Sequence, residues 1–132
     1  MPRPEDIPGP PGAWLERAKS NLLRARMERP EGVFLADYCF DAQQAAEKAL
    51  KAVLLHSGVG FRYVHALHEH VTALKNAGVQ VPADVEEAAE LTDYAIEARY
   101  PGAHEPVGEA EYRRAVAIAE RVVAWAEAMI GS

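Results

Sequence analysis

Cysteine is nearly absent from the sequence, and long apolar runs are absent altogether. The single cysteine, Cys39, cannot close a disulfide within the chain, which excludes small disulfide-stabilised secreted domains and suits a reducing cytosol. No apolar run approaches the roughly 20 residues that a membrane-spanning helix needs. The N-terminus has no basic stretch followed by an apolar core, so we expect no signal peptide. Together these absences predict a cytoplasmic protein with no membrane partner.

Positive charge is in deficit, with 14 Lys and Arg against 20 Asp and Glu and a net charge of −6. This balance argues against duplex binding through the whole surface, although it leaves room for a local basic site. A chain of 132 residues is long enough for one domain with its own core. Residues 1–12 contain five prolines and two glycines, so we expect an N-terminal arm there and a domain over residues 13–131.

Apolar residues recur every three or four positions in five segments, and none shows the alternation of a strand. The loops between these segments are short, which favours antiparallel neighbours. We therefore predict an all-α, up-and-down antiparallel bundle of four to five helices. The alanine-rich helices would also leave room for a helix of a second subunit. The expected helices span about residues 13–29, 33–57, 64–76, 82–100 and 109–130.

The second expected helix is the longest and has an apolar stripe that includes Ala42, Ala45, Ala49 and Val53. The polar residues expected on its other side are Asp37, Asp41, Gln44, Lys48 and Lys51.

Part of this polar sequence has two interpretations. An ordinary ion pair between Glu47 and Lys51, four residues apart, is one of them. The other is a cleft between two subunits, faced by Gln43, Gln44, Glu47 and Lys48.

Basic residues gather in the first expected helix and acidic residues in the fourth. They form either two solvated faces of opposite sign or, in the first helix, a rim for an anionic partner. The basic residues are Arg17, Lys19, Arg24, Arg26 and Arg29, and the acidic residues are Asp84, Glu86, Glu87, Glu90, Asp93 and Glu97.

An arginine and a histidine stand on either side of a tight turn between the fourth and fifth helices. Pro101 and Gly102 should reverse the chain there, which would bring the side chains of Arg99 and His104 to the opening of the same site. A guanidinium offers a planar fork of donors to a phosphate, and an imidazole exchanges a proton near neutral pH. The pair suits metal-free cleavage of a phosphodiester by the neighbouring ribose 2′-OH. An arginine that caps the helix and an unrelated loop histidine would give the same spacing by chance.

Other candidate sites are weaker. His65, His68 and His70 do not share one helix face, so we expect no metal there and regard His68 and His70 as surface groups. Cys39 has no evident base nearby in the sequence, which favours a buried structural thiol. The chain has neither a glycine-rich phosphate loop nor a Glu-x-x-His pair, so we expect no cofactor.

Three motifs resemble those of HEPN domains, in their order and in their spacing. Residues 40–52, Phe-Asp-Ala-Gln-Gln-Ala-Ala-Glu-Lys-Ala-Leu-Lys-Ala, are similar to the signature second helix of that family. His65-Ala66-Leu67 is similar to the start of its third helix. Arg99-Tyr100-Pro101 followed by His104 resembles the family's Arg-x4-6-His motif in its Arg-Tyr-Pro form. The resemblance extends from about residue 14 to residue 130.

The resemblance implies a homodimer with the arginine and histidine of both subunits near a shared cleft. Many members are metal-independent endoribonucleases, often the toxin of a toxin–antitoxin pair. By this resemblance Arg99 would hold the scissile phosphate, and His104 would act as the general base or acid. Tyr94 and Tyr100 would stack on a nucleotide or hydrogen-bond to it.

An alternative within the same family is a non-catalytic accessory subunit of a small nucleotidyltransferase. Active ribonuclease members usually have a small polar residue directly after the arginine, where this chain has Tyr100 and then Pro101. The acidic fourth helix would suit a basic partner surface. The sequence thus predicts RNA or nucleotide binding at a dimer cleft, with either cleavage or an accessory role.

Overall fold

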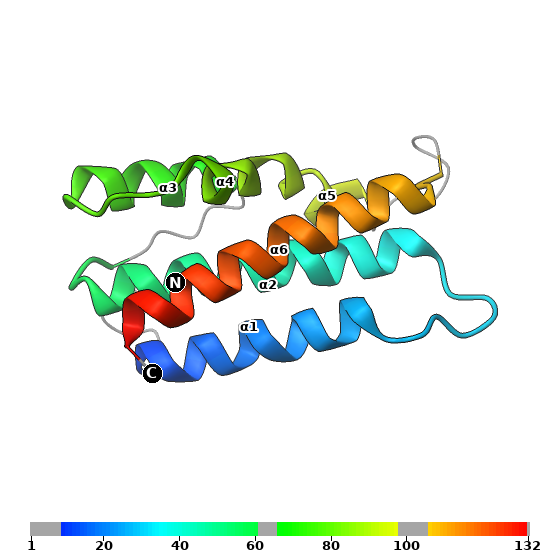
Figure 1. Ribbon diagram of the computed structural model, residues 1–132, viewed down its shortest axis with the longest axis horizontal. Coiled ribbons are helices and arrows are strands. Elements are labelled where there is room, and N and C mark those ends of the chain that lie inside the picture. The colour runs from blue at the N-terminus through cyan, green and yellow to red at the C-terminus, as the bar shows by residue number, and fades with distance from the viewer. Residues whose placement is uncertain (1–8, 61–65, 98–105, 132) are drawn as a thin grey trace.

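The computed structural model describes residues 9–60, 66–97 and 106–131, with the backbone alone for residues 96 and 97. Every regular element in these ranges is a helix, which confirms the all-α prediction (Figure 1). None of the helices in the described ranges combines the length and apolar character needed to cross a membrane. In chain order the elements are α1 (Pro11–Arg26), α2 (Leu35–His56), α3 (Leu67–Asn76), α4 (Ala83–Glu86), the 3₁₀ helix η2 (Glu87–Leu91), α5 (Tyr94–Glu97) and α6 (Glu109–Ile130).

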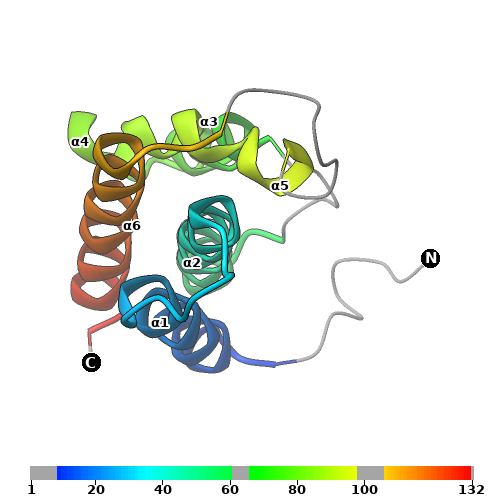
Figure 2. The same cartoon turned by 90° about the vertical axis from the view of Figure 1, so that its right-hand side faces the viewer.

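Three long helices form the main body of the bundle. Viewed along the bundle, α2 lies in the middle with α1 and α6 beside it (Figure 2). The loop after α1 reverses the chain, so that α2 runs antiparallel to α1 (Figure 1). Ion pairs join Lys19 to Glu127 and Arg26 to Glu120, which shows that α1 and α6 are antiparallel as well.

A layer of shorter helices, from α3 to α5, covers another side of α2 and α6 (Figure 2). Lys75 of α3 forms an ion pair with Glu86 of α4. At the other end of α3, the backbone N–H of Leu67 donates a hydrogen bond to Oγ1 of Thr92 over 3.1 Å. The two contacts show that α3 runs antiparallel to the segment from α4 to α5. The predicted antiparallel bundle is therefore confirmed.

Alanine dominates the contact between the long helices. Small side chains let helices approach closely, and larger residues such as Leu50, Leu54 and Ile118 fill the space that remains. The apolar residues that recur every three or four positions along α1 are buried, namely Leu15, Ala18, Leu22 and Ala25. The alanines of α2 with no exposed area are Ala42, Ala45, Ala46, Ala49 and Ala52.

The ends of the helices follow local chemistry. Helix α6 has the predicted bounds, with Glu109 and Glu111 at the positive end of its dipole and Gly131 ending it at a φ of +77°. Helix α1 begins at Pro11 rather than at residue 13, because proline suits the first turn of a helix. It ends at residue 26 rather than at residue 29, because Met27 is extended.

The continuous fourth helix predicted over residues 82–100 is wrong. The chain instead forms α4, η2 and α5, with Thr92 and Asp93 between the last two. The Thr92 hydroxyl accepts the hydrogen bond from Leu67, and both threonine and aspartate are poor residues for a helix interior.

The 3₁₀ geometry of η2 also places its glutamates on the same side of the helix. Residues three apart lie above one another in a 3₁₀ helix, so Glu87 and Glu90 point the same way. Glu87 accepts a hydrogen bond from Arg121 over 2.7 Å, and Glu90 accepts one from Arg114 over 2.7 Å. The arginines of α6 thereby hold the acidic segment against the long helices.

Candidate functional site

One of the four predicted site residues, Tyr94, lies within the described part of the chain. Arg99, Tyr100 and His104 lie outside the described residues, and their roles stay predictions. Their segment follows α5 and precedes α6. The end of the bundle at which α5 and the start of α6 lie is therefore the place to look for a site (Figure 1).

Tyr94 ties α5 to the first turn of α6. Its hydroxyl donates a hydrogen bond to Oε2 of Glu111, and its half-buried ring packs against the core. Tyr94 also shares a side-chain hydrogen bond with the thiol of Cys39 on α2. Three elements are thus joined through one side chain next to the candidate loop. The predicted contact of Tyr94 with a nucleotide stays a prediction.

A cavity of about 240 Å³ lies beside Tyr94. Arg114 binds Glu90 at its edge with two hydrogen bonds of 2.8 and 2.7 Å. This contact lowers the pKa of Glu90 below its ordinary value, so the carboxylate stays charged. The described lining of the cavity is Glu90, Leu91, Tyr94, Glu111, Arg114, Ala115 and Ile118.

The thiol of Cys39 has no exposed area, which confirms the predicted buried cysteine. Burial raises the pKa of Cys39 to about 12, and the negative charge of Glu111 acts in the same direction. The hydrogen bond with Tyr94 opposes these effects. Because only the thiolate is a good nucleophile, Cys39 is inert near neutral pH.

A chain of buried polar side chains runs along α2. Gln43 and Lys51 each donate a hydrogen bond of 2.9 Å to the carboxylate of Glu47. Gln44 donates to Gln43 over 2.8 Å. The predicted pair of Glu47 and Lys51 is confirmed, and both side chains are about nine-tenths buried.

A second polar cluster joins α2 to α1. The buried carboxylate of Asp41 accepts hydrogen bonds from Asn21 over 3.1 Å and from Arg24 over 2.8 Å. The ammonium of Lys48 donates to the amide oxygen of Asn21 over 2.7 Å.

Asp41 and Lys51, which the sequence places opposite the apolar stripe of this helix, are therefore buried too. Helix α2 is enclosed on several sides by other helices (Figure 2), so part of its polar face is buried as well. Hydrogen-bonded partners make this burial possible, because an unpaired buried charge would be costly.

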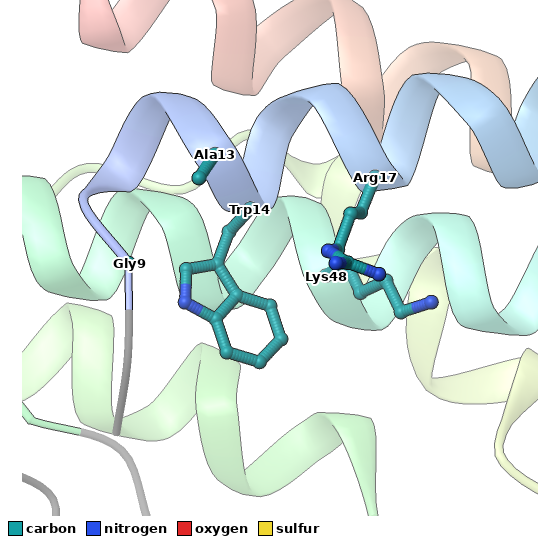
Figure 3. A pocket seen from close by; sticks show the side chains of 5 residues that line it. All are labelled: Gly9, Ala13, Trp14, Arg17 and Lys48. Atoms are coloured by element: carbon teal, nitrogen blue, oxygen red, sulfur yellow. The ribbon is translucent and has the colours of Figure 1, made fainter. Parts of the chain in front are cut away.

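A larger cavity of about 410 Å³, which was not predicted from the sequence, lies between α1 and α2 (Figure 3). Trp14 and Arg17 project into it from α1 and Lys48 from α2, with Gly9 and Ala13 completing the described lining. The sequence did contain an indication of this site, because Trp14 and Arg17 are three residues apart and so share a helix face.

Most of the uneven charge noted in the sequence is neutralised within the molecule. The basic residues of α1 other than Arg17 pair with other helices, and so do the acidic residues of α4 and η2. Among the described residues, Arg17 is an exposed cation of α1 with no hydrogen bond or ion pair. The pairs are Lys19–Glu127, Arg24–Asp41, Arg26–Glu120, Glu86–Lys75, Glu87–Arg121 and Glu90–Arg114.

The two described histidines of α3 differ in burial. His68 is exposed as predicted, whereas the surface position predicted for His70 is wrong, because only 2% of it is exposed. His70 shares the buried stripe of α3 with Leu67 and Leu74. His65 lies outside the described residues. In the described ranges, no three His, Cys, Asp or Glu side chains gather as a metal site would require.

Comparison with known proteins gives one family. A model of the HEPN domain matches residues 12–129. The crystal structure of TT1696 from Thermus thermophilus is 36% identical, with a TM-score of 0.76 over 90% of this chain and 97% of that one. The structure of ST0689, an archaeal HEPN homologue, is 25% identical, with a TM-score of 0.73 over 93% and 99% of the two chains. No curated protein matches this chain.

Proposed function

The chain belongs to the HEPN domain family, and from this premise we propose that it binds RNA at a cleft between two copies and cleaves it without a metal. The observation that carries the proposal is the spacing of Arg99 and His104 around Pro101 and Gly102, between α5 and α6 of a HEPN chain. A toxin of a toxin–antitoxin pair is the biological role that suits this chemistry.

Cleavage of a phosphodiester by the ribose 2′-OH needs one group that binds the phosphate and one general base or acid. Arg99 donates hydrogen bonds to the scissile phosphate and stabilises the charge that develops on it. His104 takes the proton of the ribose 2′-OH, whose oxygen then bonds to phosphorus. The bond from phosphorus to the 5′-oxygen breaks, and that oxygen takes up a proton. The products are a 2′,3′-cyclic phosphate and a 5′-hydroxyl, with no oxidant or metal required.

Tyr94 and its neighbours support this location. The hydrogen bond from Tyr94 to Glu111 fastens the helices on both sides of the loop, and catalytic groups work best on firmly held elements. The cavity beside Tyr94 offers an aromatic ring on which a base can stack, and Tyr100 supplies a second ring in the sequence.

A cleavage assay tests the proposal. Purified protein is incubated with a single-stranded RNA in EDTA, beside the Arg99→Ala, His104→Ala double variant. We expect products with cyclic phosphate ends from the parent and a loss of about 100-fold or more in the double variant. The matched control is Arg26→Ala, His56→Ala, which removes the same residue types from exposed positions elsewhere. Equal products from all three proteins, or none from any, would refute the ribonuclease.

The second subunit is part of the proposal. Light scattering at micromolar concentration should give the mass of a dimer, whereas the mass of a single chain would refute a site shared between copies.

The accessory-subunit alternative rests on Tyr100, which stands where active ribonuclease members usually have a small polar residue. It predicts RNA or nucleotide binding without cleavage, and co-purification with a small nucleotidyltransferase. The ion pairs of Glu86, Glu87 and Glu90 leave the acidic segment less free charge for such a partner than its sequence suggests.

A further inference from the structure

The cavity between α1 and α2 has the composition of an anion site. Its volume of about 410 Å³ falls in the range of small-molecule pockets, roughly 300–1,000 Å³. It is lined by the ring of Trp14 and by the cations Arg17 and Lys48, and no carboxylate is among its described lining (Figure 3). The cavity beside Tyr94 differs, because Glu90 and Glu111 contribute to its lining.

The charges of the described residues around this cavity do not cancel. Two nearby cations already have carboxylate partners, since Lys51 pairs with Glu47 and Arg24 with Asp41. These pairs are neutral as units. Among the described residues around the cavity, they leave Arg17 and Lys48, which line it, as cations without a paired carboxylate.

Arg17 and Lys48 have no carboxylate of this kind among the described residues. Lys48 donates a hydrogen bond to the neutral side chain of Asn21, and the exposed Arg17 forms no hydrogen bond or ion pair with another described residue. Burial lowers the pKa of Lys48, and the nearby charge of Arg17 lowers it further. Two cations that repel one another at the edge of a cavity would both gain from an anion placed between them.

We infer that this pocket binds a nucleotide, with its phosphate between Arg17 and Lys48 and its base against the indole of Trp14. A guanidinium and an ammonium make charge-assisted hydrogen bonds to phosphate oxygens. The indole offers a face or edge on which any base can pack. The ammonium of Lys51, which is paired with Glu47, lies 5.5 Å from the centre of the Trp14 ring and so holds the indole at this end of the pocket.

The site goes beyond the proposed function, because none of residues 99–104 takes part in it. The nucleotide can be a free mononucleotide or the 5′-phosphorylated end of an RNA, which present the same group to the pocket. The test separates these sources and also separates this pocket from the loop of Arg99 and His104.

Trp14 itself is the reporter in the test. The chain has two tryptophans, so Trp125→Phe leaves Trp14 as the single indole of the full-length protein. Its fluorescence is titrated with AMP, adenosine, inorganic phosphate and a 5′-phosphorylated tetra-adenylate. We expect saturable quenching by AMP, and affinities for adenosine and for phosphate that are each at least about tenfold weaker. A tetra-adenylate that binds more tightly than AMP identifies an RNA end, and the reverse identifies a free nucleotide.

Variants of the pocket decide the assignment. Arg17→Ala and Lys48→Met should each weaken AMP binding about tenfold or more, whereas Lys19→Ala, on the same helix but paired with Glu127, should leave it unchanged. Because Arg17 is exposed, its variant is expected to fold, and a thermal melt checks this. The double variant Arg99→Ala, His104→Ala should bind AMP with the same affinity as the parent. Absence of saturable quenching, equal affinity in the Arg17 variant, or equal affinity for phosphate and AMP would overturn the site.

Discussion

The two parts of the bundle are built on different chemistry. The long helices α1, α2 and α6 meet through buried alanines and through polar side chains that are hydrogen-bonded inside the protein. The layer from α3 to α5 consists of short helices held to α6 by partly exposed ion pairs. Short helices have little stability of their own, and exposed ion pairs add little. The candidate loop therefore joins a helix of the less stable layer to a helix of the core.

The largest effect is expected in the core, at the ion pair of Glu47 and Lys51. Glu47→Gln removes a carboxylate from a nearly buried ammonium, so the free energy of unfolding should fall by about 3–5 kcal/mol. Urea unfolding measures it. The double variant Glu47→Gln, Lys51→Met should cost less than Glu47→Gln alone, because the buried charge is gone. A single variant as stable as the parent would show that the pair adds nothing to the core.

A leucine from each part compares their packing directly. Leu50 of α2 and Leu91 of η2 are almost completely buried, at 0% and 1% exposure. Both alanine variants should lose about 2–5 kcal/mol, with Leu50→Ala at the upper end because the long helices cannot relax into the cavity. A cost for Leu91→Ala that equals or exceeds the cost for Leu50→Ala would contradict the comparison.

The single cysteine reports on where the bundle opens. Cys39 is completely buried, and burial raises its pKa to about 12, so the thiol reacts only when the protein opens locally and exposes it. At pH 8, Leu91→Ala should speed thiol labelling more than a core variant of equal global stability. Equal labelling rates would mean that the two parts open together.

The smallest effect is expected at Tyr112, which connects α6 to the end of α1. Its hydroxyl donates a hydrogen bond of 2.5 Å to the carbonyl oxygen of Ala25, so Tyr112→Phe should cost about 1 kcal/mol. Burial raises the pKa of Tyr112 above its ordinary value of 10.0. The folded state therefore keeps the proton, and this contribution is present below pH 10 and declines as the pH rises further. A cost that does not change across this range would refute the role of the hydroxyl.

Local patterns in the sequence were enough to predict the long helices. Apolar spacing predicted the buried stripe of α1 from Leu15 to Ala25 and the bounds of α6. It failed over residues 82–100, because the break at Thr92 depends on a hydrogen bond from Leu67, which is distant in the sequence. It could not show that Asp41 and Lys51 are buried, since a helix enclosed by others also buries polar residues that have partners.

The candidate sites also contain some residues that local sequence predicts and some contacts that only the folded chain creates. Arg99, Tyr100 and His104 follow from a motif, which is local by nature, and Tyr94 was expected to contact a ligand. Its hydrogen bond to Glu111 could not be predicted, because it depends on how α5 meets α6. The cavity of Trp14, Arg17 and Lys48 was missed for a similar reason, since it exists only when two helices lie side by side.

Binding of an uncleavable RNA is the sharpest test of a phosphate site at Arg99 and His104. A fluorescent 2′-O-methyl RNA, which lacks the attacking hydroxyl, is titrated in EDTA and followed by anisotropy, so affinity is measured apart from cleavage. We expect the Arg99→Ala, His104→Ala variant to bind this RNA about tenfold or more weakly than the parent, and the Arg26→Ala, His56→Ala variant to bind it as the parent does. Equal affinity in all three proteins would contradict a phosphate site between α5 and α6.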